Sequence, residues 1–201
     1  MSLQVPPAPP AASHSVLAAL RSPGATHRGR TPLAPGGAPC SLQPELPLPL
    51  HEMASFDPPR GGSLTRLAGW RFLLRESGAP AGAPAAGAAE TVLTADGWAF
   101  ACFSEGPYVT STQRALRQAE SMPGSYQPRL LSVPQLYMLT LWLHTDADAD
   151  ASGGTPLPAD VLIPLAPAPP GITPHLPRRV DALLPLLTRR VATTPLLRTP
   201  V

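Results

Sequence analysis

The most apolar stretch of the chain runs from Arg129 to His144, with the sequence RLLSVPQLYMLTLWLH. Apolar side chains occupy both sets of alternating positions, which predicts one central strand with both of its faces covered. A buried helix is the rival interpretation, but Pro134 and the β-favouring Val, Tyr, Thr and Trp residues argue for a strand. The stretch is shorter than the run of about 20 apolar residues that a membrane-spanning helix needs.

Alternation also predicts strands earlier in the chain. One face of the segment 64–76 carries Ala68, Trp70, Phe72 and Leu74. The other face is more polar, so this segment is expected to form a half-buried strand. Further on, Asp96-Gly97 separates the segments 90–95 and 98–103. This dipeptide favours a type I′ hairpin turn, in which both residues take a positive φ angle.

Residues 110–122 are predicted to form the one helix of the domain. Thr110 and Gln113 match a capping box, in which each side chain bonds a free backbone N–H at the helix start. Apolar residues then recur at steps of three and four, which places them on one face. Pro123-Gly124 ends the helix, because proline has no N–H to donate and glycine tolerates the turn that follows.

Residues 159–165, ADVLIPL, predict a last short strand. It is expected at an edge of the sheet, because Pro164 cannot donate a hydrogen bond to a neighbour. The predicted order is therefore strand, strand, strand, helix, strand, strand. This order indicates an α+β fold: a single small domain, residues 64–170, in which a mostly antiparallel sheet of about five strands packs against one helix.

Both flanks of this domain are expected to be irregular. Residues 1–63 are rich in proline and alanine, and their proline repeats favour polyproline II, so they are interpreted as a disordered leader or arm. Residues 171–201 form a basic tail. Pro185 lies in its middle and costs about 3 kcal/mol inside a helix, which predicts a short broken helix or disorder.

Composition narrows the possible partners. The formal net charge is only +2, so no nucleic-acid partner is expected. The two cysteines, Cys40 and Cys102, form no disulfide framework or metal motif, which favours a reducing compartment and a cytoplasmic location. The first acidic residue is Glu45, although arginines precede it. That pattern resembles an organelle transit peptide, so organelle targeting is the alternative location, and a translation start at Met53 is a further alternative.

One acidic motif suggests a metal site. Asp146, Asp148 and Asp150 are spaced like the first three ligands of a calcium loop. Ala151 stands where the sharp turn of such a loop needs glycine, and Leu157 stands where it needs a bidentate glutamate. The alternative is a solvated loop between two strands, whose like charges deter edge pairing.

His144 is the candidate ligand-binding residue, because it ends the central strand beside this acidic run. No serine or cysteine motif for nucleophilic catalysis is present in the sequence, and Cys102 is interpreted as a small core residue. No cofactor is expected.

The paired arginines of the tail are candidates for partner binding: Arg178, Arg179, Arg189 and Arg190. They would suit an acidic partner, an anionic membrane surface or nucleic acid. The alternative is a solvated tail.

These observations favour a non-enzymatic α+β module that acts through protein–protein contact, as a scaffold or interaction domain, with a partner and an oligomeric state that the sequence leaves open. One alternative is a small ligand-binding or hydrolytic domain with its site near His144, Asp146 and Asp148. Another is electrostatic tethering of the tail to an anionic surface.

Overall fold

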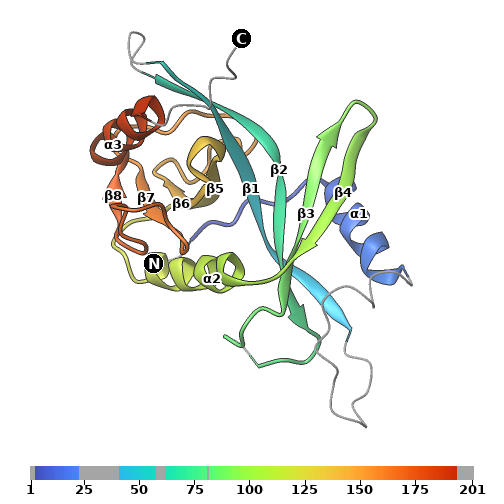
Figure 1. Cartoon of the computed structure of the whole chain (residues 1–201). Coiled ribbons are helices and arrows are strands. Elements are labelled where there is room, and N and C mark those ends of the chain that lie inside the picture. Colours follow the sequence, from blue (N-terminus) through green and yellow to red (C-terminus); the bar gives the residue numbers. More distant parts are fainter. Residues whose placement is uncertain (1–2, 23–40, 58–61, 81, 194–201) are drawn as a thin grey trace.

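The computed structural model describes residues 3–22, 41–57, 62–80 and 82–193. Eight strands form one mixed sheet in the order β4-β3-β2-β1-β5-β6-β7-β8 (Figure 1). The strands are β1 (Leu42–Asp57), β2 (Gly62–Glu76), β3 (Gly87–Thr94), β4 (Gly97–Ser104), β5 (Gln127–Val133), β6 (Met138–His144), β7 (Val161–Pro164) and β8 (Arg178–Arg179). The helices are α1 (Pro10–Arg21), α2 (Pro107–Glu120) and α3 (Val180–Thr193), with a 3₁₀ turn, η3 (Pro134–Leu136).

The sheet consists of two antiparallel halves. Strands β1 to β4 pair in chain order, and strands β5 to β8 do the same. The helix α2 connects the two halves, and the parallel pairing of β1 with β5 joins them within the sheet. The fold is α+β, as predicted, but the prediction of about five strands with one helix is wrong. Eight strands and three α-helices are present in the described ranges.

The largest error concerns the supposed N-terminal arm. Residues 42–57 form β1, which lies at the centre of the sheet, and α1 packs on the sheet as well. The prolines of β1 are tolerated because β5 pairs only with Leu50–Glu52. The proline-containing stretch 42–49 therefore has only β2 beside it, and proline is compatible with an extended strand whose other side is unpaired.

The stretch 129–144 also differs from the prediction of a single strand. It forms β5, then η3, then β6, and the two strands pair with each other in antiparallel register. The chain reverses at Tyr137, which has a left-handed φ of 49°. Both strands are buried almost throughout, which is why the pattern lacks a polar face.

The β3–β4 hairpin is confirmed, although its turn lies one residue earlier than predicted. Thr94 pairs with Gly97, so Ala95 and Asp96 form the turn, and Gly97 takes a positive φ of 111°. A bulge in β4 follows, because Ala101 has no opposite residue in β3. Cys102 is exposed, so the interpretation of this residue as part of the core is wrong.

The helix α2 begins three residues before the predicted capping box, after Gly106, and no side chain caps it. Gln113 instead holds the loop before β3, accepting from the Ala85 N–H and donating to the Ala83 carbonyl. The strand β2 is buried on both faces rather than half-buried, since α2 covers the second face.

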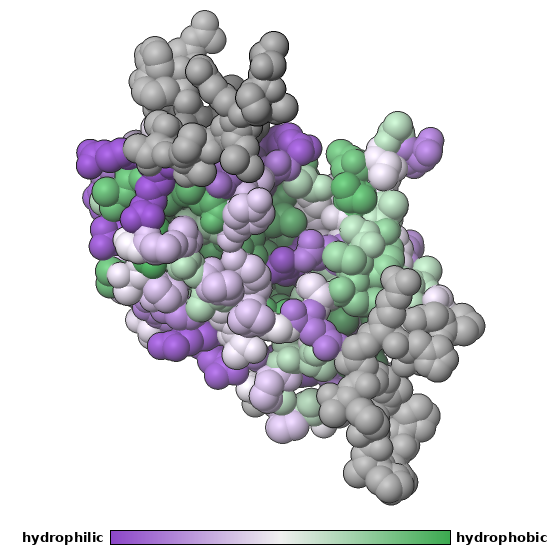
Figure 2. Space-filling view, viewed as in Figure 1, coloured by the Kyte–Doolittle hydropathy of each residue, from purple (hydrophilic) through white to green (hydrophobic). Residues whose placement is uncertain are grey.

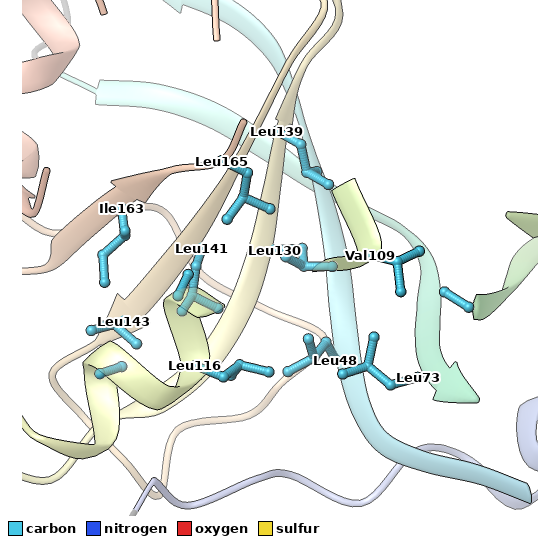
Figure 3. Close-up of a cluster of buried hydrophobic side chains, with 13 residues drawn as sticks. Leu48, Leu73, Val109, Leu116, Leu130, Leu139, Leu141, Leu143, Ile163 and Leu165 are labelled. Carbon is cyan, nitrogen blue, oxygen red and sulfur yellow. The ribbon is translucent and has the colours of Figure 1, made fainter. Parts of the chain in front are cut away.

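The main core lies between α2 and one face of the sheet (Figure 3). Leu48 and Leu73 come from the first half of the sheet, whereas Leu130, Leu141 and Ile163 come from the second half. Side chains of α2 pack against both sets. This helix therefore holds the two halves together from one side.

The opposite face carries α1 at one end and α3 at the other. Val16 of α1 packs with Trp70 and Phe72, while Leu183 and Leu187 of α3 pack with the β5–β7 region. The helix α3 runs through Pro185, contrary to the expectation of a broken helix or disorder. Burial of the two leucines offsets the helix hydrogen bond that proline cannot make.

Predicted strand 159–165 is found as β7. It is not at the edge, because β8 follows it. The strand β8 pairs only with Val161 and Leu162, and the Pro164 carbonyl accepts from the N–H of His175, just before β8, at 2.8 Å. Within the described residues, no helix is long and apolar enough to cross a membrane.

Replacing Leu48 tests whether β1 belongs to the core. Leu48 is completely buried against Leu130, so Leu48→Ala should lower the free energy of unfolding by about 2–5 kcal/mol. Urea unfolding followed by circular dichroism measures this loss. Tyr137→Ala is the control, because its side chain is 90% exposed and its removal should change stability by no more than about 0.5 kcal/mol. If both substitutions lowered stability only slightly, residues 42–57 would lie outside the core, as an external arm.

Candidate functional site

A cluster of buried polar side chains lies on the sheet face between α1 and α3, beneath the loop 145–160. Its members are His51 of β1, Gln127 and Arg129 of β5, Trp142 and His144 of β6, and Asp160 just before β7. All of them are buried, and Arg129, Trp142 and Asp160 are completely so. Charged groups are rarely buried without partners, so the partners of each one define the cluster.

Asp160 is the acceptor at the centre of the cluster. Its Oδ2 atom accepts from Trp142 Nε1–H at 2.7 Å, from His144 Nδ1–H at 2.8 Å and from the Leu157 N–H at 2.9 Å. Its Oδ1 atom accepts from the N–H and the hydroxyl of Thr145, at 2.9 and 2.8 Å. Five donors therefore surround one buried carboxylate.

These contacts keep Asp160 ionised. Burial alone would raise the pKa of the carboxyl group, but hydrogen bonds from His144 and from the N–H groups of Thr145 and Leu157 lower the pKa below its ordinary value. The carboxylate fixes both ends of the loop: Thr145 is its first residue, and Leu157 lies near its end.

Arg129 binds the middle of the same loop. It donates from Nη1 to the Gly153 carbonyl at 2.5 Å and from Nη2 to the Asp150 carbonyl at 3.0 Å, and its Nε–H bonds Gln127 at 2.7 Å. The guanidinium also stacks over the Trp142 ring, 4.9 Å from its centroid. Burial lowers the pKa of Arg129, whereas the charge of Asp160 raises it.

His51 makes the third attachment of the loop. Its Nε2–H donates to the Ala151 carbonyl at 3.0 Å, and its ring meets Trp142 edge-on, with centroids 5.2 Å apart. Burial, and then the positive charge of Arg129, lower the pKa of His51 from 6.5 to about 4. His51 is therefore neutral at physiological pH, and the buried charges of Arg129 and Asp160 balance each other.

The chemistry of this cluster is that of a clasp. An Asp–His pair also serves as the base of nucleophilic triads. Here, however, the Asp160 carboxylate is saturated with donors, and His144 is only 6% exposed and lies edge-on to Trp142. The observed contacts all hold the loop 145–160 on the sheet, and we name this cluster the loop clasp.

The structure separates the residues of the predicted site. His144 points inward and binds Asp160, whereas Asp146, Asp148 and Asp150 are exposed in the loop. Asp146 and Asp150 bond backbone N–H groups two residues further on, as in ordinary turns. Among the described residues, no three His, Cys, Asp or Glu side chains gather in a way that could hold a metal ion. The calcium site stays a prediction without structural support.

The four arginines of the tail belong to the folded body. Arg178 and Arg179 form β8, and Arg179 pairs with exposed Asp181 at 3.1 Å. Arg189 and Arg190 lie in the last turns of α3, and Arg190 lies close to Gly171. Their role in partner binding stays a prediction.

Sequence reasoning missed His51, Arg129 and Asp160. The sequence pattern places His51 in a proline-rich stretch and Asp160 at the start of a predicted strand, and neither position signals a site. Arg129 does carry a signal: a charge inside a strand predicted to be buried on both faces requires a buried partner. The partners themselves lie 21 to 24 residues away along the chain, and the His51–Ala151 contact joins residues 100 apart.

A second polar contact joins α2 to the segment before β8. Ser111 accepts from the Ala166 N–H at 2.7 Å and bonds His175 Nε2 at 3.1 Å. Among the described residues, the buried His175 Nδ1 finds no hydrogen-bond partner. Burial, and then the charge of Arg114, lower the pKa of His175. Ser111 is only 4% exposed, so this contact ties the segment to the helix.

A conspicuous feature of the described surface is the outer edge of the sheet at β4. The eight residues of this strand, GWAFACFS, include no charged residue and no proline. Ala101 and Cys102 are exposed, and on β3 Val92 and Leu93 are 39% and 52% exposed. Figure 2 shows apolar colour over much of the β3–β4 hairpin, at the upper right. Natural edge strands usually carry charges or proline, which prevent pairing with other chains.

Comparisons of the chain with protein-family models, with curated proteins and with solved structures found no match.

His51→Gln tests the pH dependence of the loop clasp. The pKa of His51 is about 4 in the folded state and 6.5 in the unfolded chain. Between these two pH values the unfolded chain binds the proton more readily, so stability falls as the pH drops. The loss between pH 6.5 and about 4 should be on the order of 3 kcal/mol. Glutamine can still donate to the Ala151 carbonyl but does not titrate, so this part of the loss should vanish.

Urea unfolding at several pH values across this window measures the effect. His14→Gln is the matched control, because His14 is exposed on α1. It should retain the pH dependence of the wild type. Parallel stability curves for His51→Gln and the wild type would contradict the assignment.

Arg129→Met tests the attachment of the loop. The carbonyls of Asp150 and Gly153 lose their donor and Asp160 loses its balancing charge, so stability should fall by about 3–5 kcal/mol. Amide hydrogen exchange in residues 145–160 should also become faster. Arg66→Met is the control, because the exposed Arg66–Glu52 pair should contribute less than about 1 kcal/mol. Similar losses in both variants, with no local change in exchange, would contradict the clasp.

Proposed function

We propose that this protein is a non-enzymatic interaction module that binds a protein partner by strand addition at β4. In strand addition, an extended segment pairs with the free backbone groups of an edge strand, and side-chain contacts supply specificity. The uncharged, eight-residue edge of β4 carries this proposal.

The side chains around β4 suit such a partner. Trp98 and Phe100 are half-buried on the face that packs near α1, while Val92 on the opposite face is exposed. An added strand would gain apolar contacts on both faces. Aromatic residues contribute strongly to protein interfaces, so Trp98 and Phe100 are the expected anchors.

The alternative of a ligand-binding or hydrolytic site has weaker support. His144 is buried beneath the loop 145–160, and Asp146 and Asp148 point into solvent rather than toward it. A substrate would reach His144 only if the loop left the sheet and broke the contacts of Arg129, His51 and Asp160.

Tail-mediated tethering also has less support than the β4 edge. Arg178 and Arg179 pair with β7 through their backbone, and Arg179 has an acidic partner in Asp181. The backbone of both arginines is held in the sheet, so they do not belong to a free tail, although the Arg179 side chain is exposed.

Peptide selection tests the proposal and requires no identified partner. Random eight-residue peptides displayed on phage are selected on the full chain. Bound peptides should slow amide exchange in β4 and leave β8 unchanged. Ala99→Lys places a charge on the edge and should weaken binding by at least about tenfold. Tyr137→Lys, with the same charge change at a 90% exposed position, should have no effect. Peptides that bind without protecting β4 would refute the proposal.

A further inference from the structure

The two edges of the sheet differ greatly. The strand β4 has eight residues and no charge. The strand β8 has two residues, both arginine, and runs directly into α3 at Val180. A contact between β4 of one copy and β8 of another would involve only two residues. Two copies that meet through their sheets must therefore meet through β4.

Resting on the proposed function, we infer that the partner at β4 is a second copy of this chain, paired with it in antiparallel register about a two-fold axis. This pairing continues the antiparallel order of β1 to β4. It also uses up both β4 edges, so the combined sheet ends in β8 on both sides and no further copy can add. The product is a dimer and not a filament.

The charge pattern supports a copy over a charged partner. Like charges placed opposite each other destabilise a strand pair, and β4 has none in any register. A charged partner strand would find no opposite charge in β4. On the neighbouring strands, Arg71 of β2 and Glu90 of β3 pair with each other at 2.6 Å.

The bulge in β4 restricts the register. Ala101 interrupts the regular alternation, so an uninterrupted ladder lies on the side of Gly97–Phe100. The two-fold axis therefore passes near Trp98 and Ala99, the two middle residues of this part. The helix α1 packs on one face of β4 but leaves Ala101 and Cys102 exposed.

Sedimentation equilibrium on the full chain, from about 1 µM to about 500 µM, covers the affinities expected of a small interface. The mass should change from one chain to two and no further. Ala99→Lys places like charges next to each other across the axis and should raise the dissociation constant by at least about tenfold. Ala101→Lys is a second edge variant in case the first fails to fold. Tyr137→Lys should dimerise like the wild type.

Disulfide cross-linking tests the register. In a Cys40→Ser, Cys102→Ser background, Ala99→Cys should give a cross-linked dimer on mild oxidation. Ser104→Cys should not, because residues far from a two-fold axis move apart from their copies in an antiparallel pair. A dimer that Ala99→Lys does not weaken, or assemblies larger than two chains, would overturn the inference.

The failure of this inference is distinct from the failure of the proposed function. A chain that stays monomeric over the whole range would overturn the homodimer. If selected peptides still protected β4 from exchange, strand addition would stand, and the partner would be another protein.

Discussion

The fold depends on a short parallel pairing at its centre. Within the sheet, the two antiparallel halves are joined only where Leu50–Glu52 of β1 meets β5, opposite Leu130, Leu131 and Ser132. Three residue pairs are a weak joint by themselves, since parallel pairing is slightly less stable per residue than antiparallel pairing. The joint is therefore held from both faces. On one face α2 packs against leucines from each half, including Leu48 and Leu130. On the other face lies the loop clasp.

The loop clasp holds this joint through polar contacts. His51 is the middle residue of the paired segment Leu50–Glu52 in β1. Arg129 directly precedes the segment of β5 that pairs with it, which begins at Leu130. Both bind carbonyls of the loop 145–160, and Thr65 of β2 donates to the Gly154 carbonyl at 2.6 Å. The loop thus crosses from one half of the sheet to the other. Buried ion groups add little net stability compared with apolar packing. Their directional hydrogen bonds, however, fix which loop residues meet which strand. The strand β1 contains prolines and bulges, so its own pairing does not fix the register of the sheet.

Local patterns in the sequence predicted local structure well. The β3–β4 hairpin and the α2 helix followed from turn residues and periodicity, with shifts of one to three residues. The sequence could not reveal β1, because Leu-Pro alternation by itself indicates polyproline II. A proline-containing strand is possible when only one of its sides pairs with a neighbour, and the sequence does not show that arrangement. It could not divide residues 129–144 either, because the left-handed turn at Tyr137 uses a residue that carries no turn signal. Most of the loop clasp could not be predicted for a related reason: its contacts join distant residues. His144 was predicted as a site residue but without its partner Asp160, and the unexplained charge of Arg129 was the other signal.

The same architecture links the β4 edge to the centre of the sheet. Helix α1 contacts β4, β3 and β1, and Leu42 at the start of β1 packs against the α1 cluster. Its buried residues Ala12 and Val16 pack in one cluster with Trp70, and Trp98, Phe100 and Ala151 of the loop pack against that cluster. Ala151 also accepts the hydrogen bond of His51. A strand added at β4, as proposed, would contact the same apolar cluster that Ala151 touches from the middle of the clasped loop. If the proposed strand bound β4 more tightly with this cluster packed than without it, binding would stabilise the attached loop by the same free energy.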